Sequence, residues 1–151
     1  MTTLCTRDVL QQAHAFHERL SLHYAELGVV AADERLRLLC DYLSGREQQL
    51  AGALARYMQD ASLHLLDAWL QNVPDERALR ACAVLTVSTR PQAEEVMEAA
   101  QHYDDCLMQM YTAMQQAAGQ DDVRHLFANL IAMEEQEKHR SSRNMQTLYD
   151  W

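Results

Sequence analysis

The sequence predicts an all-α protein in which four helices form a bundle. Glycine and proline, the two residues that break helices, number only four and two among 151 residues. Four long segments carry apolar residues at intervals of three and four, which is the period of an amphipathic helix. The second half of the chain also repeats the first at a fixed offset, which indicates two similar helical hairpins.

The length fits one domain with a single hydrophobic core, and we expect that domain to cover residues 1–151. The pattern predicts a first hairpin over residues 6–60, a crossover over 61–90 and a second hairpin over 91–149. This crossover is much longer than the roughly two to eight residues that join adjacent helices in bundles. It is therefore expected to run along the bundle and to contain short helices of its own.

The first helix is predicted to begin at Thr6 or Asp8, either of which can cap it, and its apolar stripe includes one histidine, His17. The second helix follows Asp33, a capping residue, and its stripe includes one glutamate, Glu47. Each helix of the first hairpin thus carries one polar residue where the core should be.

Pro91 stands at the predicted start of the third helix, whose stripe is interrupted by Asp104. The fourth helix is expected to begin shortly after Gly119 and to run to about residue 149, and its stripe carries Glu134 and Glu137. Because all four antiparallel helices have a polar residue in mid-stripe, these side chains should meet at one depth of the bundle.

The internal repeat places most of these polar residues at equivalent positions. An offset of 87 residues relates Tyr24 to Tyr111, Glu47 to Glu134, and His17 to Asp104. Neither hairpin can bury its apolar stripe alone, so the two hairpins are expected to pair with each other.

Burying several carboxylates together requires compensation. An ionised carboxylate taken out of water costs several kcal/mol, and like charges add to that cost. The sequence leaves four sources of compensation open: a bound cation, protons shared among the carboxylates, a wet cavity, or an arginine such as Arg46 folded inward.

The two hairpins resemble the ferritin-like superfamily, most closely its rubrerythrin-like branch, and the resemblance covers everything except the crossover. It rests on Phe16, His23-Tyr24, Asp33-Glu-Arg-Leu-Arg-Leu-Leu and Glu47, and on their counterparts Tyr103-Asp104, Tyr111, Asp121-Asp-Val-Arg-His-Leu-Phe and Glu134. In that branch each hairpin supplies a Glu from one helix and a Glu-x-x-His from the other, and together they bind two irons. The resemblance carries those roles onto His17, Glu47 and Leu50 in the first half, and Asp104, Glu134 and Glu137 in the second.

The chain departs from the pattern of that branch at several positions. Leu50 cannot bind metal, Glu137 stands where a histidine would be, and His17 and Asp104 each replace a glutamate. No Cys-x-x-Cys segment of the rubredoxin type is present. The resemblance therefore implies a modified site holding one or two ions of iron, manganese or zinc, with the ligands His17, Glu47, Asp104, Glu134 and Glu137.

Two functions follow as hypotheses. The first is a metal-binding protein with this modified carboxylate and histidine site, redox-active toward oxygen or peroxide. The alternative is a degenerate, metal-free bundle that acts as a dimerisation or scaffold module. A shift of one residue on the fourth helix would make Glu135 and His139 the ligands instead, although their spacing favours an ordinary surface pair.

Charge and cysteine content limit the partners and the location. The net charge of −9 argues against nucleic-acid binding, because phosphate recognition needs clustered Lys and Arg. The four cysteines form no Cys-x-x-Cys pair, which favours reduced thiols. The sequence has no signal segment and no membrane-spanning apolar run. We expect a cytoplasmic protein, a homodimer, with no membrane or nucleic-acid partner.

Overall fold

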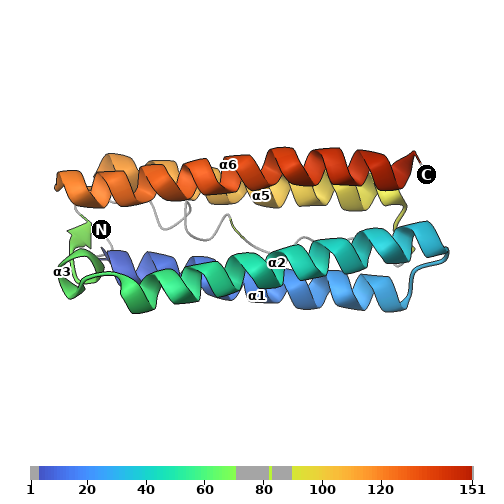
Figure 1. Ribbon diagram of the computed structural model, residues 1–151, viewed down its shortest axis with the longest axis horizontal. Helices are drawn as coiled ribbons and strands as arrows, with labels where there is room; N and C mark the ends of the chain where they lie inside the picture. The colour runs from blue at the N-terminus through green and yellow to red at the C-terminus, as the bar shows by residue number, and fades with distance from the viewer. Residues whose placement is uncertain (1–3, 71–81, 83–89, 151) are drawn as a thin grey trace.

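The computed structural model describes residues 4–70, 82 and 90–150, and four long helices account for most of them. Helices α1 (Thr6–Val29) and α2 (Glu34–Asp60) form one antiparallel hairpin, and α5 (Ala93–Ala117) and α6 (Asp121–Tyr149) form the other. The two hairpins lie along each other and give an elongated bundle (Figure 1). The predicted all-α four-helix bundle is therefore confirmed.

The residues just before α1 pair with the chain segment that follows α2. Strand β1 (Leu4–Cys5) pairs antiparallel with β2 (Trp69–Leu70), just after the short helix α3 (Leu63–Leu66). The Thr6 amide donates a hydrogen bond to the Ala68 carbonyl at 2.9 Å. Two-residue strands are too short to leave a periodic signal, and the sequence did not predict them. Most of the predicted crossover lies outside the described residues.

The helix starts agree with the sequence in part. The Asp33 side chain accepts a hydrogen bond from the Leu36 amide at 2.8 Å, as expected of a cap. At α1 the capping residue is Cys5, and its backbone amide donates a hydrogen bond to the Asp8 carboxylate. The predicted capping residue, Thr6 or Asp8, is therefore wrong: both lie inside the helix. Helix α5 begins at Ala93 with Gln92 before it, which corrects the predicted start at Pro91.

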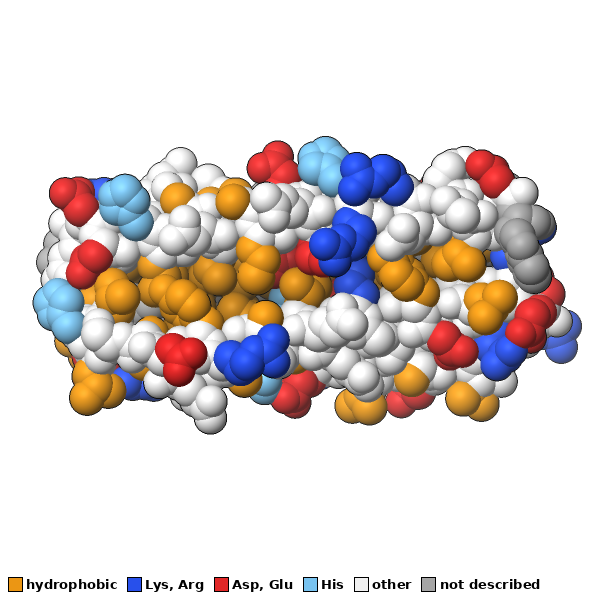
Figure 2. Space-filling view, viewed as in Figure 1, with side chains coloured by type: hydrophobic (Ala, Val, Ile, Leu, Met, Phe, Trp, Pro, Cys, Tyr) orange, Lys and Arg blue, Asp and Glu red, His pale blue; other side chains and the backbone are white. Residues whose placement is uncertain are grey.

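The core lies between the two hairpins. Each long helix turns its apolar stripe inward, and three tyrosines and two phenylalanines are fully buried among leucines and methionines. Two edge-to-face contacts cross between the hairpins: Tyr103 packs on Phe16 at 5.9 Å and on Tyr24 at 6.3 Å between ring centroids. Apolar side chains follow the seam between the hairpins, and charged side chains interrupt it near its middle (Figure 2).

Within the first hairpin, α1 and α2 are joined by a reciprocal pair of serines. The Ser21 hydroxyl is 3.0 Å from the Ser44 carbonyl, and the Ser44 hydroxyl is 2.8 Å from the Ser21 carbonyl. Small side chains at these positions let the two backbones approach closely, one turn from the polar residues of both stripes. Among the described helices, none has the length and apolar character needed to cross a bilayer.

Two leucines on α1 test this account of the core. Leu20 is 0% exposed and Leu22 is 66% exposed. We expect Leu20→Ala to lower the free energy of unfolding by about 2 to 5 kcal/mol, because it leaves a cavity between the hairpins. Leu22→Ala is the matched control and should change it by less than about 0.5 kcal/mol when unfolding is measured at a protein concentration low enough to exclude self-association. Urea unfolding measures both, and equal effects would contradict the assigned inward face.

Candidate functional site

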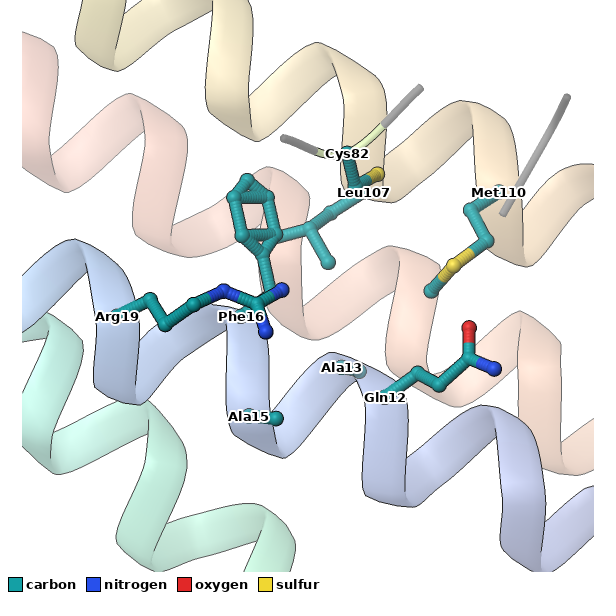
Figure 3. A pocket seen from close by; sticks show the side chains of 8 residues that line it. All are labelled: Gln12, Ala13, Ala15, Phe16, Arg19, Cys82, Leu107 and Met110. Carbon is teal, nitrogen blue, oxygen red and sulfur yellow. The ribbon is translucent and has the colours of Figure 1, made fainter. Parts of the chain in front are cut away.

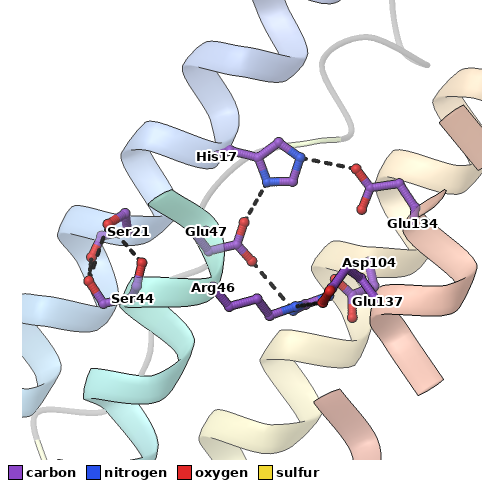
Figure 4. A network of polar contacts seen from close by, with 8 residues as sticks. All are labelled: His17, Ser21, Ser44, Arg46, Glu47, Asp104, Glu134 and Glu137. Atoms are coloured by element: carbon purple, nitrogen blue, oxygen red, sulfur yellow. Dashed lines mark hydrogen bonds and ion pairs between the residues drawn. The ribbon is translucent and has the colours of Figure 1, made fainter. Parts of the chain in front are cut away.

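A buried polar centre lies midway along the bundle, and every long helix contributes to it (Figure 4). Its members share near-complete burial, except for Glu137, whose side chain is 20% exposed. They are His17 from α1, Arg46 and Glu47 from α2, Asp104 from α5, and Glu134 and Glu137 from α6. All five residues that the sequence nominated as ligands are in this centre, together with Arg46.

His17 links the two hairpins through both ring nitrogens. Its Nδ1 lies 2.5 Å from Glu47 Oε2, and its Nε2 lies 3.1 Å from Glu134 Oε1. Both nitrogens face carboxylate oxygens, so both must donate, and this requires the positively charged imidazolium. Burial opposes that charge, but the hydrogen bonds to Glu134 and Glu47 outweigh burial and raise the pKa of His17 to about 10.

Arg46 is the second buried cation. Its Nη2 donates to Asp104 Oδ1 at 2.8 Å, its Nη1 lies 3.5 Å from Glu47 Oε1, and its Nε lies 4.0 Å from Glu137 Oε2. The guanidinium therefore contacts acids from three helices. Burial disfavours its charge, but the attraction of Asp104 and Glu47 prevails and raises the pKa of Arg46.

The protein's own cations thus reach every acid of the centre. Glu47 contacts both His17 and Arg46, Glu134 contacts His17, and Asp104 contacts Arg46. Burial still raises the pKa of Asp104 to about 6, against the opposing effect of Arg46. The result is a network of ion pairs in which no described carboxylate of the centre lacks a positively charged neighbour.

Several buried atoms beside this network have no hydrogen-bond partner among the described residues. They include Glu134 Oε2 and the hydroxyls of Tyr24 and Tyr111. Burial raises the pKa of both tyrosines well above its usual range, with smaller contributions from Glu47 at Tyr24 and Glu134 at Tyr111. Both repeat-related tyrosines therefore lie in the field of a buried acid and remain protonated.

These side chains do not fit a metal centre as they stand. Within the described part of the chain, no group of three or more His, Cys, Asp or Glu side chains is arranged to hold an ion. Both nitrogens of His17 are already bonded to carboxylates, and the guanidinium of Arg46 stands among the acids that would be ligands. The predicted ligand set is brought together here as ion pairs, and its assignment to a metal stays a prediction.

The register on α6 is the one that the apolar stripe indicates. Glu134 is fully buried, whereas Glu135 and His139 are exposed and do not face the centre. Leu50, at the position of a missing histidine, is buried at 5% exposure. Arg46 is the one residue of the polar centre that the apolar stripe of α2 does not predict. It directly precedes Glu47, and periodicity alone does not show where a long side chain will reach.

A separate cavity of about 210 Å³ lies between α1 and α5 (Figure 3). Apolar side chains, including Phe16, Leu107 and Met110, form much of its lining, and Arg19 also borders it. Cys82 lies on its wall, but burial raises the pKa of this thiol to about 12. A thiol held in that state is a poor nucleophile, so the described lining of the cavity offers no catalytic group comparable to the polar centre.

The charge on His17 makes a pH-dependent contribution to stability. Its folded pKa is about 10 against an ordinary value of 6.5, so the stabilisation is complete below about pH 6.5 and is lost as pH rises through about 10. We expect the free energy of unfolding to fall more between about pH 7 and pH 10 in the wild type than in His17→Gln. Urea unfolding at both pH values measures this difference, and parallel losses would contradict a charged His17.

Comparison with known proteins identifies a related fold. No protein-family model matches the sequence, and no curated protein matches it at a significant level. A solved structure does match: a proposed ferritin-like diiron-carboxylate protein from Thermotoga maritima, with a TM-score of 0.61 over 97% of each chain and 16% sequence identity. At this identity the similarity establishes the fold alone, and the rubrerythrin-like branch remains a prediction. The chain therefore has the four-helix-bundle fold of that ferritin-like structure.

Proposed function

We propose that this protein is a metal-independent ferritin-like bundle that acts as a helical dimerisation module. The observation that supports metal independence is the guanidinium of Arg46, which is 3% exposed and lies 2.8 Å from Asp104 inside the polar centre. Together with His17 it gives the centre two fixed positive charges that belong to the chain itself. The four-helix architecture is then retained without the ions that the fold can hold.

Electrostatic repulsion between the Arg46 guanidinium and a metal cation supports the proposed metal independence. Two unit charges about 4 Å apart interact by about 4 kcal/mol at the effective dielectric of a protein interior, and a divalent ion doubles that value. A metal ion among Glu47, Asp104 and Glu137 would meet such repulsion from Arg46, which cannot be deprotonated. The guanidinium would have to leave the centre before a metal could enter.

The outer face of the first hairpin supports the dimerisation role. A shallow groove of about 380 Å³ lies between α1 and α2, with Ser21, Ala51 and Gly52 among the small residues that line it. Leu22 also lines it and is 66% exposed. In a two-fold dimer the same patch meets itself, so the exposed Leu22 of each chain would pack against the groove of its partner.

A second candidate is the metal-binding function, with iron, manganese or zinc and reactivity toward oxygen or peroxide. The buried Glu134 Oε2 favours it, because an unpartnered carboxylate oxygen invites a cation or a water molecule. His17, Glu47, Asp104, Glu134 and Glu137 would hold the ion, and a redox-active metal would supply the electron transfer. This candidate requires Arg46 to turn out of the centre.

Metal content separates the two candidates. We expect wild-type protein purified without chelator to contain less than about one tenth of an equivalent of iron, manganese or zinc, and to show no rise in melting temperature with added Fe²⁺ or Mn²⁺. Mass spectrometry of dissolved metals and thermal unfolding measure these values. The double variant Glu47→Ala, Glu134→Ala is the comparison. Stoichiometric metal in the wild type that disappears in this variant would refute metal independence.

Oligomeric state tests the dimerisation role. We expect a wild-type dimer at about 100 µM by sedimentation velocity, and a monomer for Leu22→Glu, because a charge at the position of Leu22 would be buried in the contact and would lie near Glu18 of the same groove. Val29→Glu is the matched control, since Val29 is also on α1, is 85% exposed and does not line the groove. A wild-type monomer, or equal loss of the dimer in both variants, would contradict the proposed surface.

A further inference from the structure

We propose that Cys82 and Cys106 form a reversible disulfide when a hydroperoxide oxidises them, and that this bond ties residue 82, between the two hairpins, covalently to α5. Cys82 lies on the wall of the cavity between α1 and α5. Neither cysteine belongs to the ion-pair network of the polar centre or to the groove proposed as the dimer surface. The inference is therefore independent of the proposed function.

The contact between the two thiols carries the first step. Cys82 and Cys106 are far apart in sequence, yet their thiols lie within hydrogen-bonding contact of each other. Figure 3 shows Cys82 beside Leu107, the residue that follows Cys106 on α5. A disulfide needs its sulfurs about 2.0 Å apart, and thiols already in contact reach that separation by side-chain rotation. Both thiols are free in the structure, which therefore describes the reduced form of the pair.

The surroundings of the pair select a small oxidant. Cys82 and Cys106 are each 8% exposed, so a protein oxidant has almost no surface of either sulfur to attack. The cavity beside Cys82 has a volume of about 210 Å³. A cavity of about 150 Å³ already holds benzene, and hydrogen peroxide is much smaller than benzene. The cavity thus gives a hydroperoxide a route to the sulfur that a larger oxidant lacks.

The reaction balances with hydrogen peroxide as the oxidant. One sulfur attacks a peroxide oxygen and breaks the O–O bond, so that a sulfenic acid forms and the thiol proton leaves with the released hydroxide as water. The second sulfur displaces the hydroxyl of the sulfenic acid, which leaves with the second thiol proton as another water. The S–S bond forms, and two electrons pass from the sulfurs to the peroxide. A dithiol reverses the reaction by exchange.

Burial sets the rate of this reaction. It raises the pKa of Cys82 to about 12 and also raises the pKa of Cys106. The thiolate is the attacking species, so the first step is slow at neutral pH. We therefore expect oxidation over hours rather than seconds, as in a pair that records sustained oxidation.

Peptide mapping of the wild-type protein tests the disulfide directly. The protein is treated with excess hydrogen peroxide for hours and digested without reduction by a protease that cleaves after glutamate. Such a protease separates the two cysteines, because Glu94, Glu95 and Glu98 lie between them. We expect a linked pair of peptides that contains Cys82 and Cys106 and is about 2 Da lighter than the two free peptides together. Dithiothreitol should separate them, whereas it leaves oxidised methionines unchanged.

Single substitutions identify the sulfurs that react. Cys82→Ser and Cys106→Ser should each abolish the linked peptides. Cys40→Ser is the matched control, because Cys40 is also a buried thiol whose pKa burial raises, but it lies on α2. This variant should give the same linked peptides as the wild type, at the same rate.

Three outcomes of the wild-type map overturn the inference. They are linked peptides that join other cysteines, oxidation of Cys82 and Cys106 to sulfinic or sulfonic acids without a link, and persistence of both free thiols while Cys5, which is more exposed, is oxidised. The wild-type map decides among these outcomes even if a serine variant fails to fold. The proposed function is tested separately, by metal content and oligomeric state.

Discussion

The bundle depends on the neutralisation of four carboxylates that its helices carry toward a common centre. Glu47, Asp104 and Glu134 are almost completely buried, and each would cost several kcal/mol if it were ionised without a partner. His17 and Arg46 provide the partners from within the chain. The apolar layers on both sides of the centre pack around side chains whose positions these ion pairs fix.

The same network explains how the two hairpins find one register. Buried ion pairs are weak contributors to net stability, because desolvation offsets much of their attraction. Their geometry is nevertheless demanding: the bonds from His17 to Glu134 and from Arg46 to Asp104 both run between hairpins. A slip of one residue on α6 would turn Glu134 toward solvent, place Glu135 opposite His17, and bring Lys138 to the position of Glu137 beside the Arg46 guanidinium. Two like charges would then meet in the centre, so the alternative register is much less stable.

Periodicity predicted the helices and the polar positions well, because each acid interrupts an apolar stripe and the repeat gives a second copy of the pattern. Helix starts were less certain, as the caps at Cys5 and Gln92 show. What the sequence left open was how the acids are compensated, and inward folding of Arg46 was one of four possibilities. A long side chain next to Glu47 can point to solvent or to the core, and only the positions of Asp104 and Glu137 on other helices decide between them.

The departures from the rubrerythrin-like pattern make sense together when they are counted as charges and volumes. Relative to the pattern that the resemblance implies, His17 in place of a glutamate exchanges a negative charge for a positive one, and Leu50 in place of a histidine puts a buried apolar side chain there. Asp104 is one methylene shorter than the glutamate that the resemblance leads one to expect, and its Oδ1 accepts a hydrogen bond from Arg46 Nη2 at 2.8 Å. Each of these changes alone would only weaken a metal site. Together they supply a positive charge at His17 and a hydrogen-bond acceptor at Asp104 for the guanidinium of Arg46. The buried acids therefore require compensating charge, and among the described residues His17 and Arg46 lie close enough to supply it.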